Sequence, residues 1–314
     1  MRALTLQNNK LHLDEEYPLP QATGESCIRL KLGGICATDL ELVRGYMSFE
    51  GVIGHEWVGI VESSPEEKWV GKRVVGEINC PCGHCPQCRT GHGNHCPSRT
   101  VLGIAGRDGA FSEFFSLPEE NLHLVPESVT DEEAVFVEPL AAALRILEQV
   151  SITPNQRVYV MGLGRLGQLC TRVLQQTGAE VIGVARTPRR MQFLPTGVRG
   201  IVVSELRKPA DIVVDCTGSA LGLQQAIRWV KPMGTVVLKT TVHEAEAISP
   251  NDWVIHELTI IGSRCGPFDK ALAWLAEHPI SLQGLVTGVF SLEDGIQAMD
   301  VARTPGALKT LLHP

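Results

Sequence analysis

Four cysteines in the first third of the chain have the spacing of a metal-binding loop. In the segment CGHCPQCRTGHGNHC they are separated by two, two and seven residues, as Cys82, Cys85, Cys88 and Cys96. The glycines and proline between them allow the tight turns that bring four thiolates together. Four soft ligands at this spacing favour a closed, tetrahedral zinc site. Because a closed site leaves no position for a substrate, we expect this zinc to brace the loop.

Two alternative roles for these cysteines fit the pattern less well. Unrelated reduced thiols have no reason to cluster at zinc-ligand spacing. A zinc finger that grips nucleic acid would need a recognition helix or a basic face, and neither follows the loop. We expect the neighbouring spare groups to lie outside the ligand set, beside the metal or in solvent: Cys80, His84, His92 and His95.

Three separated segments each contain a residue that can bind a metal. They are Cys36-Ala37-Thr38-Asp39, Gly54-His55-Glu56 and Val137-Glu138-Pro139-Leu140. Taken alone, a single cysteine usually packs as a small apolar residue, and a single histidine is usually a hydrogen-bonded part of the structure. The meaning of these segments therefore depends on the rest of the chain.

A glycine-rich turn follows the strand-like run RVYVM and opens a predicted helix. Its residues are Gly162, Leu163, Gly164, Arg165, Leu166 and Gly167. Glycines at these places permit a tight turn and the close approach of a pyrophosphate, whose charge the helix N-terminus stabilises. A G-x-G-x-x-G motif between a strand and a helix predicts dinucleotide binding.

The strand after this turn ends without the acid that would bind the ribose 2′-hydroxyl of NAD. The run EVIGVA ends at Ala185, and Arg186, Thr187, Arg189 and Arg190 follow. Guanidinium groups there can pair with a 2′-phosphate, so the pattern favours NADP over NAD. The alternative is that these arginines form a solvated loop.

A second turn at the end of a predicted strand, Asp215-Cys216-Thr217-Gly218-Ser219, lies at the edge of the sheet where the nicotinamide half is expected. We predict cofactor contacts for Cys216 and Thr217. The alternative for each of these residues is a turn without any contact to the cofactor.

The secondary-structure elements that must position these residues follow two different patterns along the chain. Up to about residue 130, short β-like runs alternate with Gly- and Pro-rich turns, which predicts a mostly β domain. These runs include Cys27–Leu32, Gly59–Glu62, Arg73–Glu77 and Phe111–Leu117. After a helical stretch at 132–150, strands and helices alternate, which predicts an α/β fold with a doubly wound parallel sheet. Its expected strands are 158–161, 180–185, 212–216, 235–239 and 259–262, its helices 166–177 and 221–230; a helix at 268–277 and a strand-and-helix tail at 290–301 follow.

Composition limits the class of protein. The chain has 314 residues, 44% of them hydrophobic, and a formal charge of −7, which predicts a folded protein of about two domains and no nucleic-acid partner. The first residues become polar by Gln7, and the most apolar stretch falls short of the ~20 residues that cross a bilayer. We therefore expect a cytoplasmic protein with no membrane contact.

Taken together and in order, these motifs resemble the zinc-dependent medium-chain dehydrogenase/reductase (alcohol dehydrogenase) family, in particular its polyol, sugar and threonine dehydrogenase branch. The resemblance covers nearly the whole chain. It implies a mostly β, GroES-like catalytic domain at 1–143, completed by 267–314, and a Rossmann-type domain at 144–266. It also implies two zinc ions per chain, a small alcohol or carbonyl substrate, and a homodimer or homotetramer, for which the run Thr259–Gly262 offers an edge strand.

The resemblance assigns roles to the three separated segments. Cys36, His55 and Glu56 look like ligands of a catalytic zinc, and Glu138 looks like a further carboxylate that binds the metal or holds its water. A catalytic zinc keeps one position open and lowers the pKa of an alcohol bound there. Thr38 is then placed to pass on the alcohol proton, and Asp39 to orient His55; the alternative for both is a turn cap.

One position and one segment differ from what relatives carry. Many relatives have a histidine shortly after the Cys36 segment that completes a proton relay, and here Glu41 or Leu42 occupies that neighbourhood. The span between Arg190 and Asp211 is too short for the usual helices and strands, so we expect the cofactor domain to lack roughly one helical element. Lys309, in the last strand, matches a commonly basic position and receives no role.

These observations predict an NAD(P)-dependent zinc oxidoreductase that moves a hydride between a secondary alcohol, polyol or sugar and the cofactor. One alternative is a non-catalytic NADP(H)-binding sensor that retains the structural zinc. Another is a zinc-independent quinone or enone reductase of the same fold. The presence of all the expected ligand residues argues against the sensor, because binding alone needs no open zinc site.

Overall fold

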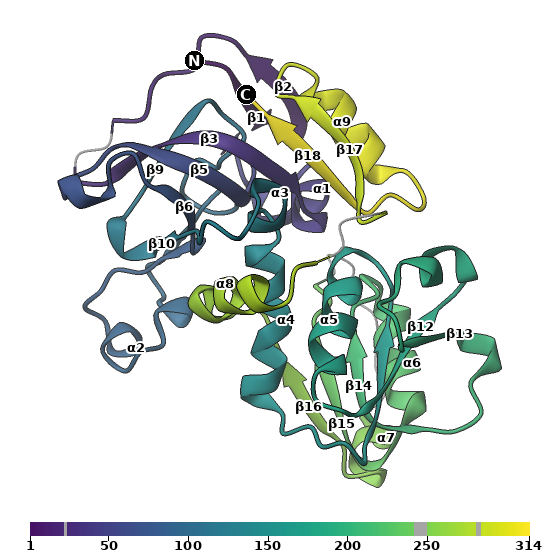
Figure 1. The fold of residues 1–314 in the computed structure, drawn as a ribbon. Coiled ribbons are helices and arrows are strands. Elements are labelled where there is room, and N and C mark those ends of the chain that lie inside the picture. The colour runs from purple at the N-terminus through teal and green to yellow at the C-terminus, as the bar shows by residue number, and fades with distance from the viewer. Residues whose placement is uncertain (22–23, 242–249, 281–283) are drawn as a thin grey trace. The chain divides into compact units, whose positions relative to one another are not determined.

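The computed structural model describes residues 1–21, 24–241, 250–280 and 284–314, and these form two compact units (Figure 1). The first unit contains Met1–Glu138 and Phe268–Pro314, and the second contains Pro139–Pro267. The sequence placed the two crossings near residues 143 and 267. The chain therefore leaves the first unit and returns to it.

The first unit is built mainly from antiparallel strands. Its largest sheet has the order β10-β6-β5-β3-β18-β17, with β9 also paired to β3. A three-stranded sheet has the order β2-β1-β4, and β7 pairs with β8. The strands are β1 (Ala3–Gln7), β2 (Lys10–Asp14), β3 (Ser26–Ile35), β4 (Gly51–Val52), β5 (Glu56–Ser63), β6 (Arg73–Gly76), β7 (Asn79–Cys80), β8 (Thr100–Val101), β9 (Phe114–Leu117), β10 (Leu122–Leu124), β17 (Val286–Ser291) and β18 (Lys309–His313).

Short helices join these strands. The α-helices of this unit are α1 (Ala37–Leu42), α2 (Pro86–Arg89), α3 (Asp131–Ala134), α8 (Phe268–Glu277) and α9 (Gly295–Arg303). The 3-10 helices are η1 (Tyr46–Ser48), η2 (Glu67–Trp69), η3 (Gly93–His95) and η4 (Glu119–Asn121). Most of them are single turns, so the strands dominate the unit.

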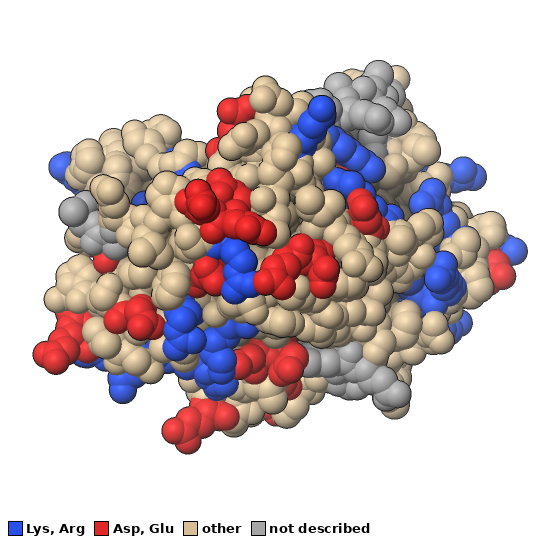
Figure 2. Space-filling view, turned by 90° about the horizontal axis from the view of Figure 1, so that it is seen from above, with Lys and Arg blue, Asp and Glu red and all other residues tan. Residues whose placement is uncertain are grey.

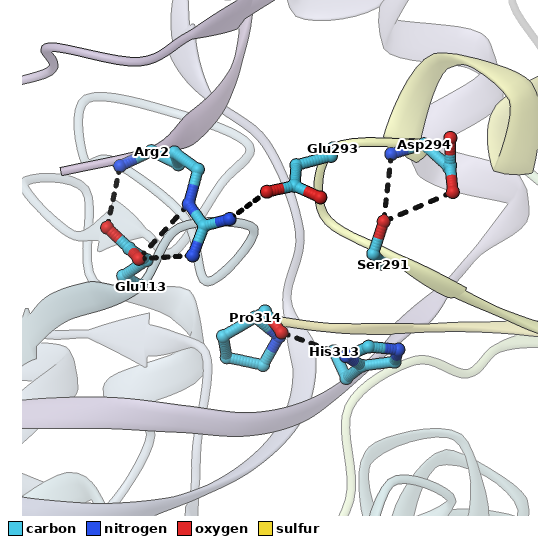
Figure 3. A network of polar contacts seen from close by, with 7 residues as sticks. All are labelled: Arg2, Glu113, Ser291, Glu293, Asp294, His313 and Pro314. Carbon is cyan, nitrogen blue, oxygen red and sulfur yellow. Dashed lines mark hydrogen bonds and ion pairs between the residues drawn. The ribbon is translucent and has the colours of Figure 1, made fainter.

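The C-terminal segment completes the first unit. Strand β18 pairs with β3, and Leu312 and Met299 are buried in one core cluster with Leu4 and Ile35. Figure 3 shows the polar side of this closure, where the Arg2 guanidinium contacts both Glu113 and Glu293. The same close-up shows Ser291 bonded to Asp294 at the turn before α9.

The second unit is a six-stranded parallel sheet of order β13-β12-β11-β14-β15-β16. Its strands are β11 (Arg157–Met161), β12 (Glu180–Ala185), β13 (Arg199–Val202), β14 (Ala210–Asp215), β15 (Val230–Leu238) and β16 (Thr259–Gly262), and its helices are α4 (Val137–Gln149), α5 (Arg165–Gln175), α6 (Ala220–Trp229) and α7 (Asn251–Ile255), with two 3-10 helices, η5 (Pro188–Phe193) and η6 (Val203–Glu205). The chain runs outward from β11 in one direction and from β14 in the other. Because such crossovers are right-handed, α5 and α6 lie on opposite faces. The gap between the carboxyl ends of β11 and β14 is therefore the switch point at which such sheets bind ligands.

Several elements differ from the sequence prediction. The expected helix at 132–150 is divided into α3 and α4, with Pro139 in the first turn of α4, where a missing N–H is tolerated. The expected strand at 111–117 begins only at Phe114, because the Phe111 backbone bonds to Leu4 and Ile53 instead. Between Ala185 and Ala210 the chain forms the short strand β13 with 3-10 turns and no α-helix, which agrees with the expected trimming.

Two further observations concern the surface. None of the helices formed by the described residues has both the length and the apolar composition needed to cross a lipid bilayer. On the face shown in Figure 2, basic and acidic side chains lie beside each other and do not form one continuous basic area. Such a mixture gives little attraction to a polyanion.

Candidate functional site

Cys36 and His55 come together at the ends of neighbouring strands in the first unit. Cys36 follows β3 and is the N-cap residue of α1, while His55 directly precedes β5, which pairs with β3. Gly54 before the histidine has φ +98°, and a Cβ there would lie 2.3 Å from the Phe111 ring. Only glycine therefore lets the chain turn here and present His55 towards Cys36.

Asp39 holds both of these residues. One carboxylate oxygen accepts a 2.7 Å hydrogen bond from the Cys36 backbone N–H, and the other lies 3.2 Å from Nδ1 of His55. Asp39 and His55 are almost fully buried. Burial opposes a charge on the imidazole, but Asp39 and the Cys36 thiolate outweigh it and hold the pKa of His55 well above its usual range. The contact agrees with the expected role of Asp39, to orient the ring, which stays a prediction.

Glu56 forms a buried ion pair with Lys309. Glu56 is the first residue of β5 and Lys309 the first of β18, and both strands flank β3. Both side chains are 1% exposed, and the Lys309 ammonium contacts the Glu56 carboxylate. Gly34 makes room for the pair, since a Cβ there would lie 2.9 Å from the Glu56 carboxylate and 3.1 Å from the Lys309 side chain. The lysine ammonium also lies 5.6 Å from the centre of the Phe136 ring.

Cys36, His55 and Glu56 offer ligand atoms that all lie within 4.8 Å of one another. Thiolate, imidazole and carboxylate are a donor set that zinc accepts, and three protein ligands leave a position open, as in catalytic sites. The residues present therefore fit a zinc ion. Glu138, the second residue of α4, is not a member of this group, and its role stays a prediction.

The residues expected to take part in proton transfer differ in exposure and in their partners. The Thr38 hydroxyl lies 3.8 Å from the Cys36 sulfur and its side chain is partly exposed. Leu42 is fully buried in the core, while the Glu41 carboxylate pairs with Arg44 at 2.7 Å. Of the two positions that stand in for the relay histidine, only Glu41 therefore has a titratable group.

The four-cysteine loop is closed. The sulfurs of Cys82, Cys85, Cys88 and Cys96 all lie within 4.8 Å of one another, with Cys85 and Cys88 3.4 Å apart and Cys82 and Cys88 4.0 Å apart. Sulfurs bound at 2.3 Å around one tetrahedral zinc lie about 3.8 Å apart, so the loop fits the ion. Cys85 is the N-cap of α2, with Pro86 at its first position.

Hydrogen bonds and burial give the cysteine thiols in this region different pKa values. Backbone N–H groups of His84 and Cys85 point at the Cys82 sulfur and lower the pKa of Cys82 to about 6. Cys80, by contrast, is buried, and burial raises the pKa of its thiol to about 11. Cys80 does not join the ligand group. Two histidines of the loop bond elsewhere: Nδ1 of His84 to the Cys82 carbonyl, and Nδ1 of His92 to the Thr90 hydroxyl.

The glycine-rich turn occupies the switch point of the second unit. Gly162, at φ +90°, packs so closely on the end of β14 that a Cβ would lie 2.6 Å from the Cys216 carbonyl oxygen. A Cβ on Gly167 would lie 1.9 Å from the Gly162 carbonyl oxygen. Gly164 is the N-cap of α5 and has no side chain to occupy the free N–H groups of the first helical turn. The turn is thus a cradle that fits a pyrophosphate.

Cationic side chains gather next to this turn. A Cβ on Gly164 would lie 3.4 Å from the Arg190 guanidinium, which places Arg190 over the helix N-terminus. Burial, and then the positive charges of Arg165, Arg189 and Arg186, lower the pKa of Arg190. Mutual repulsion of four guanidinium groups favours an anion among them. Ala185, at the end of β12, adds no competing carboxylate.

The turn after β14 contains the two further residues predicted to contact the cofactor. Cys216 is partly exposed and Thr217 is exposed, and the Thr217 N–H bonds to the Asp215 carboxylate at 2.9 Å. The Lys239 ammonium, directly after β15, donates to the Ala142 carbonyl at 2.6 Å and to the Ser263 hydroxyl at 3.1 Å. Lys309 was noticed as basic, but its pairing with Glu56 joins positions 253 residues apart and left no local signal.

Comparison with known proteins agrees with this arrangement. Residues 22–127 match the alcohol dehydrogenase GroES-like domain, and residues 166–277 match the zinc-binding dehydrogenase domain. A probable D-xylulose reductase A of Aspergillus fumigatus is 29% identical over 335 aligned positions, which cover 95% of this chain and 92% of the relative.

Solved structures are similar over the whole chain. RspB of Escherichia coli CFT073, a short chain alcohol dehydrogenase complexed with NADH, has a TM-score of 0.90 and 28% identity, with 100% of this chain and 99% of that chain covered. A zinc-binding dehydrogenase of Sinorhizobium meliloti 1021 bound to NADP has a TM-score of 0.87 and 26% identity, with the same coverage.

Fold and site together define an oxidoreductase of the zinc-dependent, NAD(P)-linked type that acts on alcohols or polyols. The chain belongs to the zinc-dependent medium-chain dehydrogenase/reductase family, the alcohol dehydrogenases, and resembles its polyol dehydrogenases.

Proposed function

We propose that this enzyme interconverts a secondary hydroxyl of a polyol and the corresponding ketone, with NADP as the preferred cofactor. The cluster of Cys36, His55 and Glu56 carries the proposal, because its ligand atoms lie within 4.8 Å of one another. The similarity to a D-xylulose reductase supports a polyol as substrate.

Each residue around this cluster has its own role in the proposed reaction. When zinc is bound there, it lowers the pKa of an alcohol and polarises the carbonyl of the product. Asp39 fixes the ring of His55, and Lys309 fixes the carboxylate of Glu56. The Thr38 hydroxyl, near the Cys36 sulfur, accepts the alcohol proton and passes it towards solvent. Glu138 is the further carboxylate of the set.

The cofactor assignment has two parts. The turn from Gly162 to Gly167 and the N-terminus of α5 hold the pyrophosphate, while Cys216 and Thr217 border the nicotinamide side. Arg186 and Arg190 contact the 2′-phosphate, because the end of β12 has no acid and the guanidinium groups repel one another. The loop from Cys82 to Cys96 holds a second, structural zinc.

The experiment is a steady-state assay of the zinc-loaded protein. Xylitol and other C4–C6 polyols are tested with NADP⁺ and with NAD⁺, and reduced cofactor is measured by its absorbance. We expect polyol-dependent reduction, a higher kcat/KM with NADP⁺, and about two zinc ions per chain by metal analysis. Stronger turnover with NAD⁺ would refute the NADP assignment.

The alternatives give different outcomes in the same assay. A cofactor-binding sensor would bind NADPH, hold one zinc and turn over no polyol. A zinc-independent quinone or enone reductase would reduce such acceptors and keep its activity after chelation leaves the protein folded. Either result would overturn the proposal, and circular dichroism after chelation controls for unfolding.

The free edge of the parallel sheet supports a symmetric dimer as part of this proposal. Strand β16 is the last strand of that sheet, and neighbouring side chains are exposed, including Val254 at 74% and Ile255 at 73%. Pairing of β16 with a second copy would cover the edge. Light scattering of the wild type and of an Ile261→Pro variant checks this, because proline removes one N–H from the edge.

A further inference from the structure

Two thiols that take no part in the proposed proton and hydride transfer face each other beneath the cofactor turn. Cys170 in α5 and Cys216 after β14 have their sulfurs 3.8 Å apart, with the Cys216 thiol donating to the Cys170 sulfur. Neither belongs to a metal-ligand group among the described residues. Cys170 is fully buried, whereas Cys216 is partly exposed at the edge of the sheet.

The surroundings favour a thiolate on one of the two sulfurs. The hydrogen bond from Cys216, opposed by burial and aided by the positive charge of Lys239, lowers the pKa of Cys170. The same contact and burial raise the pKa of Cys216 well above its usual range. Lys239 is held in place by the Ala142 carbonyl and the Ser263 hydroxyl. One sulfur is thus prepared as a nucleophile and the other as its proton donor.

The same thiols sit where backbones are in tight contact. Gly162 packs against the backbone of Cys216 and Thr217, and a Cβ on Gly167 would lie 3.5 Å from the Cys216 Cβ. The turn after β11, the start of α5 and the turn after β14 are therefore in close contact with one another. Any movement of Cys216 towards α5 must shift the glycine-rich turn.

We propose that Cys170 and Cys216 form a peroxide-oxidisable dithiol whose disulfide weakens cofactor binding. In the first step the thiolate of one cysteine attacks one oxygen of hydrogen peroxide, the O–O bond breaks, and hydroxide leaves and takes up a proton as water. In the second step the sulfur of the other cysteine attacks the resulting sulfenic acid, the S–O bond breaks, and a second water forms with the proton of that cysteine. The two thiols lose two electrons, which the peroxide accepts.

Disulfide formation requires the sulfurs to approach from 3.8 Å to about 2 Å. This approach pulls the Cys216 turn against Gly162 and distorts the cradle assigned above to the pyrophosphate. The coupling rests on the proposed function, whereas the formation of the disulfide does not. A thiol reductant reverses the reaction by thiol–disulfide exchange.

The test compares the wild type with Cys170→Ser, with Cys170→Ala in case the serine variant does not fold, and with Cys27→Ser as a matched control. Cys27 is a partly buried free cysteine in the first unit. The zinc-loaded proteins are treated with hydrogen peroxide, remaining thiols are alkylated, and peptides are mapped by mass spectrometry. NADPH affinity is measured by fluorescence before oxidation, after it, and after dithiothreitol, with zinc content followed throughout.

We expect a peptide link between Cys170 and Cys216 in the wild type and in Cys27→Ser, and no such link in the Cys170 variants. NADPH affinity should fall by about tenfold on oxidation, without zinc loss, and recover with dithiothreitol. Absence of the link overturns the site, and a link with unchanged NADPH affinity overturns the coupling. If the reduced wild type binds neither NADPH nor NADH, the proposed function fails, while the peptide map still decides whether the dithiol is oxidised.

Discussion

The Lys309 ammonium forms an ion pair with the Glu56 carboxylate in the interior of the catalytic unit, and both side chains are 1% exposed. The pair spans β3, at the position where Gly34 lacks a side chain. It ties the last strand of the chain to a residue of the candidate zinc cluster. The return of the C-terminal segment to the first unit thus serves the site as well as the core.

Replacement of Lys309 by methionine should destabilise the protein strongly. Glu56 would be left as a buried charge without its partner, which costs about 3–5 kcal/mol. Urea unfolding measures the loss, and the double variant Lys309→Met/Glu56→Gln should recover much of it because no buried charge remains. Lys68→Met is the matched control, since its pair with Glu66 is exposed and worth about 0–1 kcal/mol. Equal effects of Lys309→Met and Lys68→Met would contradict the interpretation.

Local patterns in the sequence predicted most of the second unit. The bounds of β12 and β16 coincide with the expected ones, as do those of α8 in the first unit, because alternation and helical periodicity are local properties. The glycine-rich turn was likewise found from its spacing alone. Strand β13 was missed, because a four-residue strand between 3-10 turns has no distinct period.

Long-range pairing could not be obtained in this way. The contact of Lys309 with Glu56 and that of Cys170 with Cys216 depend on which strands become neighbours. Cys36, His55 and Glu56 were grouped by family resemblance, and the structure brings their ligand atoms together through the pairing of β3 with β5. Residues that are brought together only by the order of strands in a sheet have no characteristic spacing in the sequence.

Loss of one loop cysteine should remove one zinc and leave the other. Cys96→Ser deletes a fully buried sulfur of the four-cysteine group, so metal content should fall from about two to about one zinc per chain. The loop should then become sensitive to trypsin at Arg89 or Arg99, which limited proteolysis detects. Cys80→Ser is the control, because Cys80 is buried nearby but lies outside the group. If Cys80→Ser lost the metal and Cys96→Ser kept it, the ligand assignment would be wrong.

Cofactor preference should depend on the guanidinium groups that follow β12. Arg190→Ala and Arg186→Ala remove contacts expected with the 2′-phosphate, and a charge-assisted hydrogen bond is worth about 1.5–3 kcal/mol. NADPH affinity should therefore fall by about 10–100-fold, and NADH affinity much less. Fluorescence titration with both cofactors measures the ratio. Arg207→Ala, an exposed arginine bonded to the Ser204 and Leu206 carbonyls, should leave both affinities unchanged. Equal losses for NADPH and NADH in Arg190→Ala would show that Arg190 does not read the phosphate.

The pair of Glu25 and Arg107 should make stability depend on pH in the acid range. Arg107 donates hydrogen bonds of 2.7 and 2.8 Å to the two Glu25 oxygens, and these bonds, against the opposing effect of burial, hold the pKa of Glu25 below its usual range. A depressed carboxyl pKa stabilises the folded protein fully above the unfolded-state pKa of about 4.3, and this contribution is lost as the pH falls through the lower folded-state pKa. Glu25→Gln should thus lower the free energy of unfolding by about 2 kcal/mol near neutral pH and by much less near pH 3. Urea unfolding across this range measures the difference. Glu180→Gln is the control, because Glu180 is half exposed and its ion pair with Arg157 contributes little to stability. A loss that stays constant with pH would mean that the carboxylate charge of Glu25 is not what stabilises this contact.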